Sequence, residues 1–233
     1  MTISTLVNKM AASVSNNKSV AAAETEKFDI DGDVEDIYKQ LPPLPSPLPK
    51  QHKDFVHSNP KGEPEFRKFT VFTAGSIEMG KAVQWQHRMA TMLSDLPITV
   101  CNPRKGQWNS AVTPEAKHQD FRDQVSWELA GLEQADVIIF FFDVTTKSPV
   151  SLLELGLWAG SDKVIVCCND KFWRQGNVKI TCGRYGVPMV GSFAELVPAV
   201  RDMLYAKGMR LDENGDLIGP NVHVRKEKPK KKA

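Results

Sequence analysis

Glu154 is the residue whose surroundings most favour chemistry. It is the single charged residue in the otherwise largely apolar stretch 149–160, and the Ser148–Pro149 pair before it is typical of a helix start. Burying a lone carboxylate costs on the order of several kcal/mol unless a partner compensates, so its presence indicates a purpose. Two purposes are open. Glu154 could act in catalysis, or it could cap its own helix, because Ser151 and Glu154 also fit a capping box.

Glu128 is a second candidate. It lies on a long helix expected over 115–134, whose apolar stripe consists of Phe121, Val125, Leu129 and Leu132. At about 100° per residue, Glu128 falls only about 55° from the centre of that stripe, and Gln124 lies one turn earlier on the same edge. Glu128 and Glu154 are therefore expected to point inward from helices that flank one strand. Neighbouring like charges are usually tolerated for chemistry, although a buried pair can also be structural.

Polar or conformationally special residues follow three of the expected strands. They are Gly75, Ser76, Ile77 and Gly80 after the first, Arg104 and Trp108 after the second, and Asp143 and Ser148 after the third. The glycine-rich turn offers backbone amides to an anion such as phosphate. Arg104 could hold a phosphate, and Trp108 could stack on a base. Each has a structural alternative. The glycine-rich turn could be only a tight connection, Trp108 could cover the sheet edge, and Asp143 could cap its turn.

The elements that must position these residues alternate along the chain. Strands are expected at 69–74, 98–101, 137–142, 163–168 and 187–190, and helices at 81–93, 115–134, 149–160 and 193–205. This alternation predicts an α/β fold with a doubly wound, mostly parallel sheet of about five strands. Ligands of such folds bind beyond the carboxyl ends of the strands, where the polar residues gather.

Composition excludes several classes of protein. A net charge of +2 gives no extended surface for nucleic acid, and no apolar run approaches the length of a membrane span. The four cysteines show no metal-ligand spacing, which is typical of reduced core thiols in an intracellular compartment. No metal or cofactor is expected. We expect a cytoplasmic location, with nuclear import through the lysine-rich end as an alternative.

The chain is expected to divide into three parts. Residues 1–65 are predicted to be a disordered region with a Pro-rich linker, LPPLPSPLP, that could also be a peptide ligand. Residues 66–207 are predicted to be the folded domain, and residues 208–233 a basic tail. A chain cut to 65–207 is therefore expected to fold by itself, unless a segment such as 28–38 docks on the core.

Taken together, these motifs resemble the nucleoside 2-deoxyribosyltransferase superfamily over residues 69–190. Glu154-Leu155-Gly156 matches the position of the family's nucleophilic glutamate. Gly75-Ser76-Ile77 and Ser148 are similar to the branch of deoxynucleoside 5′-monophosphate N-glycosidases, whose serine six residues before the glutamate binds phosphate. The transferases carry an aspartate there. Glu128 stands where both branches have an aspartate, and 102–104 with 124–128 resemble a less characterised branch.

The resemblance implies cleavage of the N-glycosidic bond of a nucleoside or its 5′-monophosphate. Glu154 would attack C1′, and Glu128, or less readily Asp143, would orient the sugar or move a proton. The Gly75–Ser76 amides and Ser148 would hold a 5′-phosphate, and Trp108 or Trp85 would flank the base. Family members complete the site across a subunit interface, so a homo-oligomer, in the simplest case a dimer, is expected. Asn177 is the candidate for the donated residue.

Two other classes of protein remain open. The first is a catalytically inactive nucleotide-sensing module, for which the glutamate at position 128 in place of the usual aspartate leaves room. The second is an adaptor that recruits partners through the Pro-rich segment and the basic tail. The presence of Glu154, Glu128 and Ser148 together favours an enzyme, either a hydrolase or a transferase.

Overall fold

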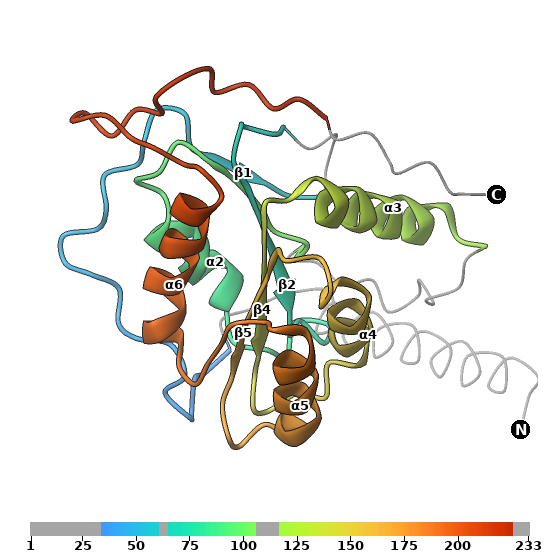
Figure 1. Ribbon diagram of the computed structural model, residues 1–233. Helices are drawn as coiled ribbons and strands as arrows, with labels where there is room; N and C mark the ends of the chain where they lie inside the picture. The colour runs from blue at the N-terminus through green and yellow to red at the C-terminus, as the bar shows by residue number, and fades with distance from the viewer. Residues whose placement is uncertain (1–33, 61–64, 106–116, 226–233) are drawn as a thin grey trace, which may run out of the picture.

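The sheet of this protein consists of six parallel strands, as a computed structural model shows for residues 34–60, 65–105 and 117–225 (Figure 1). Their spatial order is β1–β3–β2–β4–β5–β6. The strands are β1 (Val56–Ser58), β2 (Thr70–Gly75), β3 (Thr99–Cys101), β4 (Val137–Phe142), β5 (Val164–Cys168) and β6 (Met189–Val190). The predicted doubly wound parallel fold is thus confirmed.

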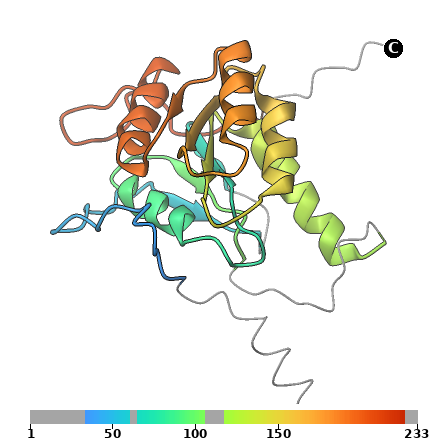
Figure 2. The ribbon, with the colours of Figure 1, turned by 90° about the horizontal axis from the view of Figure 1, so that it is seen from below.

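Helices cover both faces of the sheet (Figures 1 and 2). Their bounds are α2 (Trp85–Met92), α3 (Gln119–Gln134), α4 (Pro149–Trp158), α5 (Gln175–Tyr185) and α6 (Phe193–Ala206). One buried cluster joins α2 and α6 to one face, and a second joins α3, α4 and α5 to the other. Because alternate residues of β4 enter the two clusters, this strand is buried on both faces, as its continuous apolar sequence predicts.

The strand order reverses at β2. The chain passes from β2 to β3 on one side and then to β4 on the other, so the first turns after β2 and β4 diverge. Open α/β sheets bind ligands in the crevice at such a point, at the carboxyl ends of the strands. Ser76 and Asp143 directly follow these two strands. The topology therefore brings together residues that are 67 positions apart in the sequence.

Two glycines allow the close packing that fixes this edge. Gly75 has a φ of +131°, and a Cβ there would clash with the backbone of Phe141 on β4. On α3, a Cβ at Gly131 would lie 2.7 Å from the Phe72 ring. Helix α3 thus approaches β2 closely, which sets the depth of the carboxylate that α3 carries one turn earlier.

Two elements were not expected from the sequence. Strand β1 pairs with β3, placing Val56 opposite Thr99, and helix α5 follows β5. Helix α2 begins at Trp85 rather than at residue 81, because Glu78, Met79 and Gly80 have positive φ and form a turn. The expected start of α3 at 115–116 lies outside the described residues.

Apolar residues outside 66–207 pack on the core. Val34, Leu41 and Phe55 contact the cluster under α2 and α6, and Met209 is fully buried in it. The Pro-rich segment is held by Arg88, whose Nη1 donates to the Pro42 carbonyl oxygen at 2.5 Å. The described part of this segment therefore lies on the domain rather than outside it as a linker.

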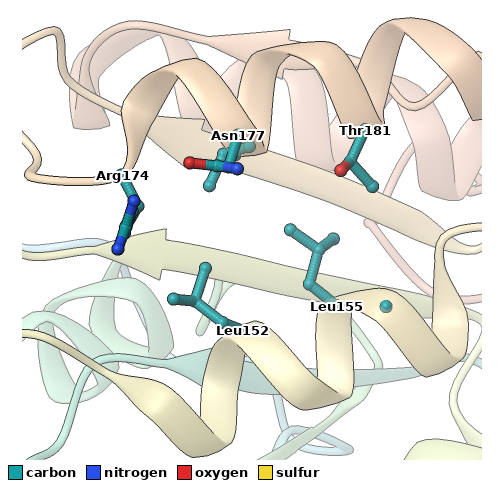
Figure 3. A pocket seen from close by; sticks show the side chains of 7 residues that line it. Leu152, Leu155, Arg174, Asn177 and Thr181 are labelled. Carbon is teal, nitrogen blue, oxygen red and sulfur yellow. The ribbon is translucent and has the colours of Figure 1, made fainter.

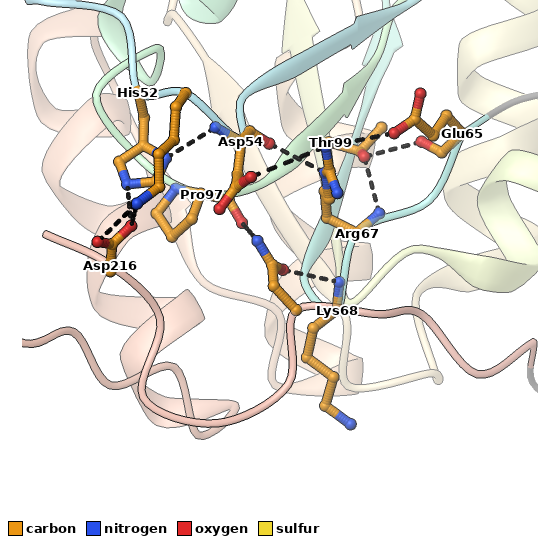
Figure 4. Close-up of polar contacts among 10 residues, drawn as sticks. His52, Asp54, Glu65, Arg67, Lys68, Pro97, Thr99 and Asp216 are labelled. Atoms are coloured by element: carbon orange, nitrogen blue, oxygen red, sulfur yellow. Dashed lines mark hydrogen bonds and ion pairs between the residues drawn. The ribbon is translucent and has the colours of Figure 1, made fainter.

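Polar contacts join the two flanking segments to each other and to the sheet (Figure 4). The Asp216 carboxylate contacts Lys53 Nζ at 2.7 Å and His52 Nε2 at 3.2 Å. Arg67 donates to the Asp54 carbonyl oxygen and lies 3.4 Å from Glu65. These contacts connect chain segments on both sides of the domain limits that the sequence suggests.

Several expectations concern residues outside the described ranges. They are the disorder expected for 1–33 and 61–64, the base-stacking role of Trp108, and the lysine-rich end, for which nuclear import gains no support. The four cysteines are free and buried, and burial raises the pKa of Cys101, Cys167 and Cys168 to about 12.

Among the described helices, none combines the length and the apolar character that crossing a bilayer requires.

These contacts change the prediction for a shortened chain. Cutting to 65–207 removes β1, Phe55 and Met209, a loss on the order of 4 kcal/mol in stability and so about 10 °C in melting temperature. A chain of residues 34–225 should keep the melting temperature of the whole protein. Thermal melts of the three chains test this. Equal melting of the 65–207 chain would show that the flanking segments contribute nothing.

Candidate active site

Glu128 on α3 and Glu154 on α4 form a pair of half-buried carboxylates. They interact closely enough for the charge of Glu128 to raise the pKa of Glu154. Gln124 Nε2 donates to Glu128 Oε1 at 2.7 Å and lies 3.4 Å from the Pro103 carbonyl oxygen. Within the described part of the chain, the Glu154 carboxylate makes no hydrogen bond or ion pair. The sequence placed Glu128 and Glu154 on helices that flank one strand, and in the structure the two side chains are close enough to interact electrostatically.

Both carboxylates hold protons more tightly than usual. Burial, and then the charge of Glu128, raises the pKa of Glu154 from 4.5 to about 8. Burial also raises the pKa of Glu128, while the Gln124 hydrogen bond and the charge of Lys105 oppose that rise. Two interacting carboxyl groups titrate as a pair, so near neutral pH they share about one proton. Such a pair can supply one nucleophilic oxygen and one acidic proton at the same time.

Ser151 excludes the capping-box interpretation of Glu154. Helix α4 begins at Pro149, so Ser151 lies inside its first turn rather than at the cap position. Its hydroxyl donates to the Gly75 carbonyl oxygen at 2.6 Å. The capping box that would have explained Glu154 is absent from α4. Ser151 instead ties α4 to the end of β2, a role that the sequence did not reveal.

A buried cluster of three hydroxyls joins the turns after β2 and β4. Ser76 Oγ lies 2.6 Å from Ser148 Oγ, and Thr146 Oγ1 lies 2.9 Å from the first and 2.8 Å from the second. Ser148 has left-handed backbone angles (φ 49°, ψ 52°), and its side chain makes no cap hydrogen bond to α4. The predicted helix start at Ser148 and Pro149 is confirmed, although the Ser148 hydroxyl turns toward Ser76 and does not cap the helix.

Asp143 is fully buried and shapes the same joint. Its Oδ2 accepts from Val83 N at 2.8 Å, and its Oδ1 accepts from Thr145 N at 2.8 Å and from Gln40 Nε2 at 3.1 Å. These hydrogen bonds favour the alternative in which Asp143 stabilises its turn. Gln40, which sequence reasoning missed, also accepts from Val144 N at 3.0 Å and anchors the N-terminal segment here.

The sequence suggested that Arg104 could hold a phosphate, but in the structure its guanidinium binds the chain's own backbone. Only 5% of the residue is exposed, and its guanidinium donates to the carbonyl oxygens of Gly80 at 3.1 Å, Ala82 at 2.9 Å and Val83 at 2.9 Å. Carbonyl groups of one turn thus take the place of a phosphate. Ile77 closes that turn, since its carbonyl oxygen accepts from Gly80 N at 3.0 Å.

The tryptophans differ in what they contact. Trp85, expected to flank a base, is fully buried, donates from Nε1 to the Ser76 carbonyl oxygen at 2.9 Å, and packs on Phe141. Trp127 precedes Glu128, and no role in the site was expected for it. Its buried indole N–H has no acceptor among the described residues, which costs about 1–3 kcal/mol.

A groove of about 290 Å³ separates α4 from α5 (Figure 3). It is lined by Leu152, Leu155, Gly156, Arg174, Asn177, Val178 and Thr181. Asn177 lies in this groove, whereas Glu154 is not among the lining residues. A smaller cavity of about 110 Å³ lies at the ends of β4 and β5, beside Gln40 and Lys171. Among the described residues, no hydrogen bond joins Asn177 to either carboxylate.

His52, Asp54 and Asp216 are close enough together to suggest a metal site. His52 Nδ1, however, accepts the Asp54 N–H at 3.0 Å, so in the neutral ring Nε2 carries the proton that points to Asp216. The Lys53 ammonium occupies the same carboxylate. The donor set therefore fits an ion-pair clamp better than a cation.

Comparison with known families agrees with the geometry. Residues 68–172 match the family described as nucleoside 2-deoxyribosyltransferase like. The match runs from the start of β2 past the end of β5, so it includes Ser76, Glu128, Ser148 and Glu154, whereas Asn177 lies beyond it. No curated protein matches the chain. Residues 68–172 of this α/β domain are therefore similar to the nucleoside 2-deoxyribosyltransferase-like family.

Proposed function

We propose that the domain cleaves the N-glycosidic bond of (deoxy)nucleosides or their 5′-monophosphates, with Glu154 as the nucleophile. The observation that carries this proposal is the Glu154 carboxylate, which is half-buried, close to Glu128, and without a hydrogen-bond partner among the described residues. A protein does not keep such a group for stability, because burial without a partner is unfavourable. Its free oxygens are available to a substrate.

In the first half of the reaction, the proton that the pair shares passes from Glu154 to Glu128, and the ionised Glu154 attacks C1′ of the sugar. A bond forms between its carboxylate oxygen and C1′ while the bond from C1′ to the base nitrogen breaks, and the electron pair stays on the base. Glu128, which holds the proton that the pair shares, donates it to the leaving base. The products are a neutral base, a sugar ester on Glu154, and ionised Glu128.

In the second half, Glu128 acts as the base. It removes a proton from an incoming water or from the N–H of a second base, whose electron pair forms a new bond to C1′. The ester bond breaks, Glu154 becomes a carboxylate again, and Glu128 regains its proton. Water as the acceptor makes the protein a hydrolase, and a second base makes it a transferase.

The neighbouring residues have supporting roles. Gln124 orients Glu128 through the 2.7 Å hydrogen bond, and Ser151 fixes the first turn of α4. Asp143 and Arg104 maintain the turns around the joint through their buried hydrogen bonds, so we assign them no part in proton transfer. The alternative function, an inactive nucleotide-binding module, predicts binding without turnover.

We further propose that the protein forms a homo-oligomer through α4. Val150, Leu153 and Leu157 lie one turn apart and are each more than 60% exposed, which is unusual for such an apolar row. The α4–α5 groove with Asn177 borders the same helix. A second copy that covers this face could bring its Asn177 to the first copy's site. Sedimentation of the wild type measures the oligomeric state.

Replacement of Glu154 by glutamine should abolish turnover without unfolding the protein. An amide cannot form the sugar ester, so the rate should fall at least about 10³-fold. The assay is release of free base from a panel of deoxynucleosides and their monophosphates. Glu213→Gln, which alters an exposed carboxylate in the segment after α6, is the control and should keep full activity. Wild-type turnover by the Glu154 variant would end the mechanism.

The raised pKa of Glu154 also predicts a pH-dependent stability. Because the folded protein holds this proton up to about pH 8 and the unfolded chain releases it near 4.5, the stabilisation is complete at low pH and is lost as pH rises through about 8. Glu154→Gln has no such proton to lose. Its melting temperature relative to wild type should therefore increase between about pH 5 and 8. Parallel melting curves across that range would refute the perturbed carboxyl group.

The pH dependence of activity should be bell-shaped. The reactive form carries one proton on the pair, so kcat/KM should fall as pH rises through about 8 and the last proton leaves. Glu128→Gln removes both the acid and the neighbouring charge, so the rate should drop about 10²- to 10⁴-fold and the alkaline limb should disappear. Asp123→Asn, an exposed change on the same helix, should leave the bell intact. A Glu128→Gln variant with an unchanged alkaline limb would contradict the pairing.

A further inference from the structure

The start of α4 already holds an anion from the chain itself. Glu78 Oε2 accepts from Lys147 N at 2.6 Å and from Ser148 N at 3.3 Å. Backbone N–H groups at a helix start, together with the helix dipole, attract negative charge, and in many proteins that charge is a phosphate. Here a carboxylate from the turn after β2 takes the position.

The turn that carries Glu78 is built to aim its side chain this way. Glu78, Met79 and Gly80 have successive φ values of 45°, 51° and 84°, which is an unusual run for the two residues that have a Cβ. Hydrogen bonds from Gly80 N and Ala82 N to the Ile77 carbonyl oxygen close the turn at 3.0 and 3.2 Å. Arg104 secures it by donating to the Gly80 carbonyl oxygen. The carboxylate is therefore fixed by its backbone rather than placed there by chance.

The other groups expected to bind a phosphate are used within the domain. Ser76 N donates to the Phe141 carbonyl oxygen at 2.9 Å, and the hydroxyls of Ser76 and Ser148 are buried against each other and Thr146. Arg104 is occupied by backbone carbonyls. A 5′-phosphate would thus have to displace Glu78 and break these contacts.

The position is also where a 5′-phosphate would arrive. Six residues separate Ser148 from Glu154, a rise of about 9 Å along α4. That length corresponds to a nucleoside whose C1′ lies at Glu154 and whose 5′ end reaches toward the helix start. A phosphate there, with its negative charge, would meet the Glu78 carboxylate, and like charges at contact distance repel strongly.

We propose that Glu78 is a specificity-determining residue that occupies the place of a 5′-phosphate, so that this domain takes unphosphorylated nucleosides in preference to nucleoside 5′-monophosphates. This inference rests on the proposed function, because it uses the same site. It reverses the substrate preference that Ser148 suggests from the sequence alone. The resemblance in motif remains, but the hydroxyl and the backbone N–H of Ser148 serve internal contacts.

The test is a binding measurement that needs no turnover. Calorimetric titrations in the Glu154→Gln background compare each deoxynucleoside with its 5′-monophosphate, so that no ligand is consumed. Three chains are titrated: one with Glu78 intact, one with Glu78→Gln, which removes the charge and keeps the shape, and one with Glu78→Gly, which removes the side chain and suits the positive φ. Glu35→Gln, an exposed change in the N-terminal segment, is the matched control.

The intact chain should bind the nucleoside at least about tenfold more tightly than its monophosphate. That ratio should shrink in Glu78→Gln, shrink further in Glu78→Gly, and stay unchanged in the control. Tighter binding of the monophosphate by the intact chain would overturn the role of Glu78 and leave the Glu154 mechanism standing. A large ratio that neither variant alters would also overturn it. Failure of every ligand to bind would remove the proposed function and this inference with it.

Discussion

The junction between the ends of β2 and β4 is the constraint on which the site depends. Gly75 allows the two strands to touch at their carboxyl ends, where a Cβ would collide with Phe141. Ser151 then fixes α4 to the Gly75 carbonyl oxygen, and Ser76 links the two turns through buried hydroxyl contacts. Because Glu154 lies one turn after Ser151, this junction sets where its carboxylate points. The position of the proposed nucleophile thus follows from the attachment of α4 to the end of β2.

The carboxylate pair has the opposite energetic character. The junction satisfies its polar groups internally, whereas Glu154 is left without a partner among the described residues and keeps its proton up to about pH 8. Glu128 is only partly compensated, by Gln124 and by the charge of Lys105. Stability is therefore gained where β2 and β4 meet and is given up where α3 and α4 face each other, a pattern expected when a site is organised for chemistry.

The sequence predicts those parts of the fold whose signal is local. The apolar strands and the amphipathic helices predicted the parallel sheet. The isolation of Glu154 in an apolar helix made it a candidate site residue. Strand β1 was missed because its three residues become a strand only by pairing with β3, about 40 residues away. Helix α5 was missed because most of it is polar or exposed. The partners of Arg104, Ser148 and Glu78 could not be predicted, since a side chain of the right type can equally bind a ligand or the chain's own backbone.

The central claim is that Glu154 forms a covalent bond to the sugar. Intact-protein mass spectrometry, after incubation with a deoxynucleoside whose 2′-fluorine slows hydrolysis of the sugar ester, tests this most directly. The account predicts a mass increase of one fluorinated sugar, located by peptide mapping on Glu154, together with release of an equal amount of base. Release of base without any adduct, or an adduct on Glu128 or Asp143, would contradict it.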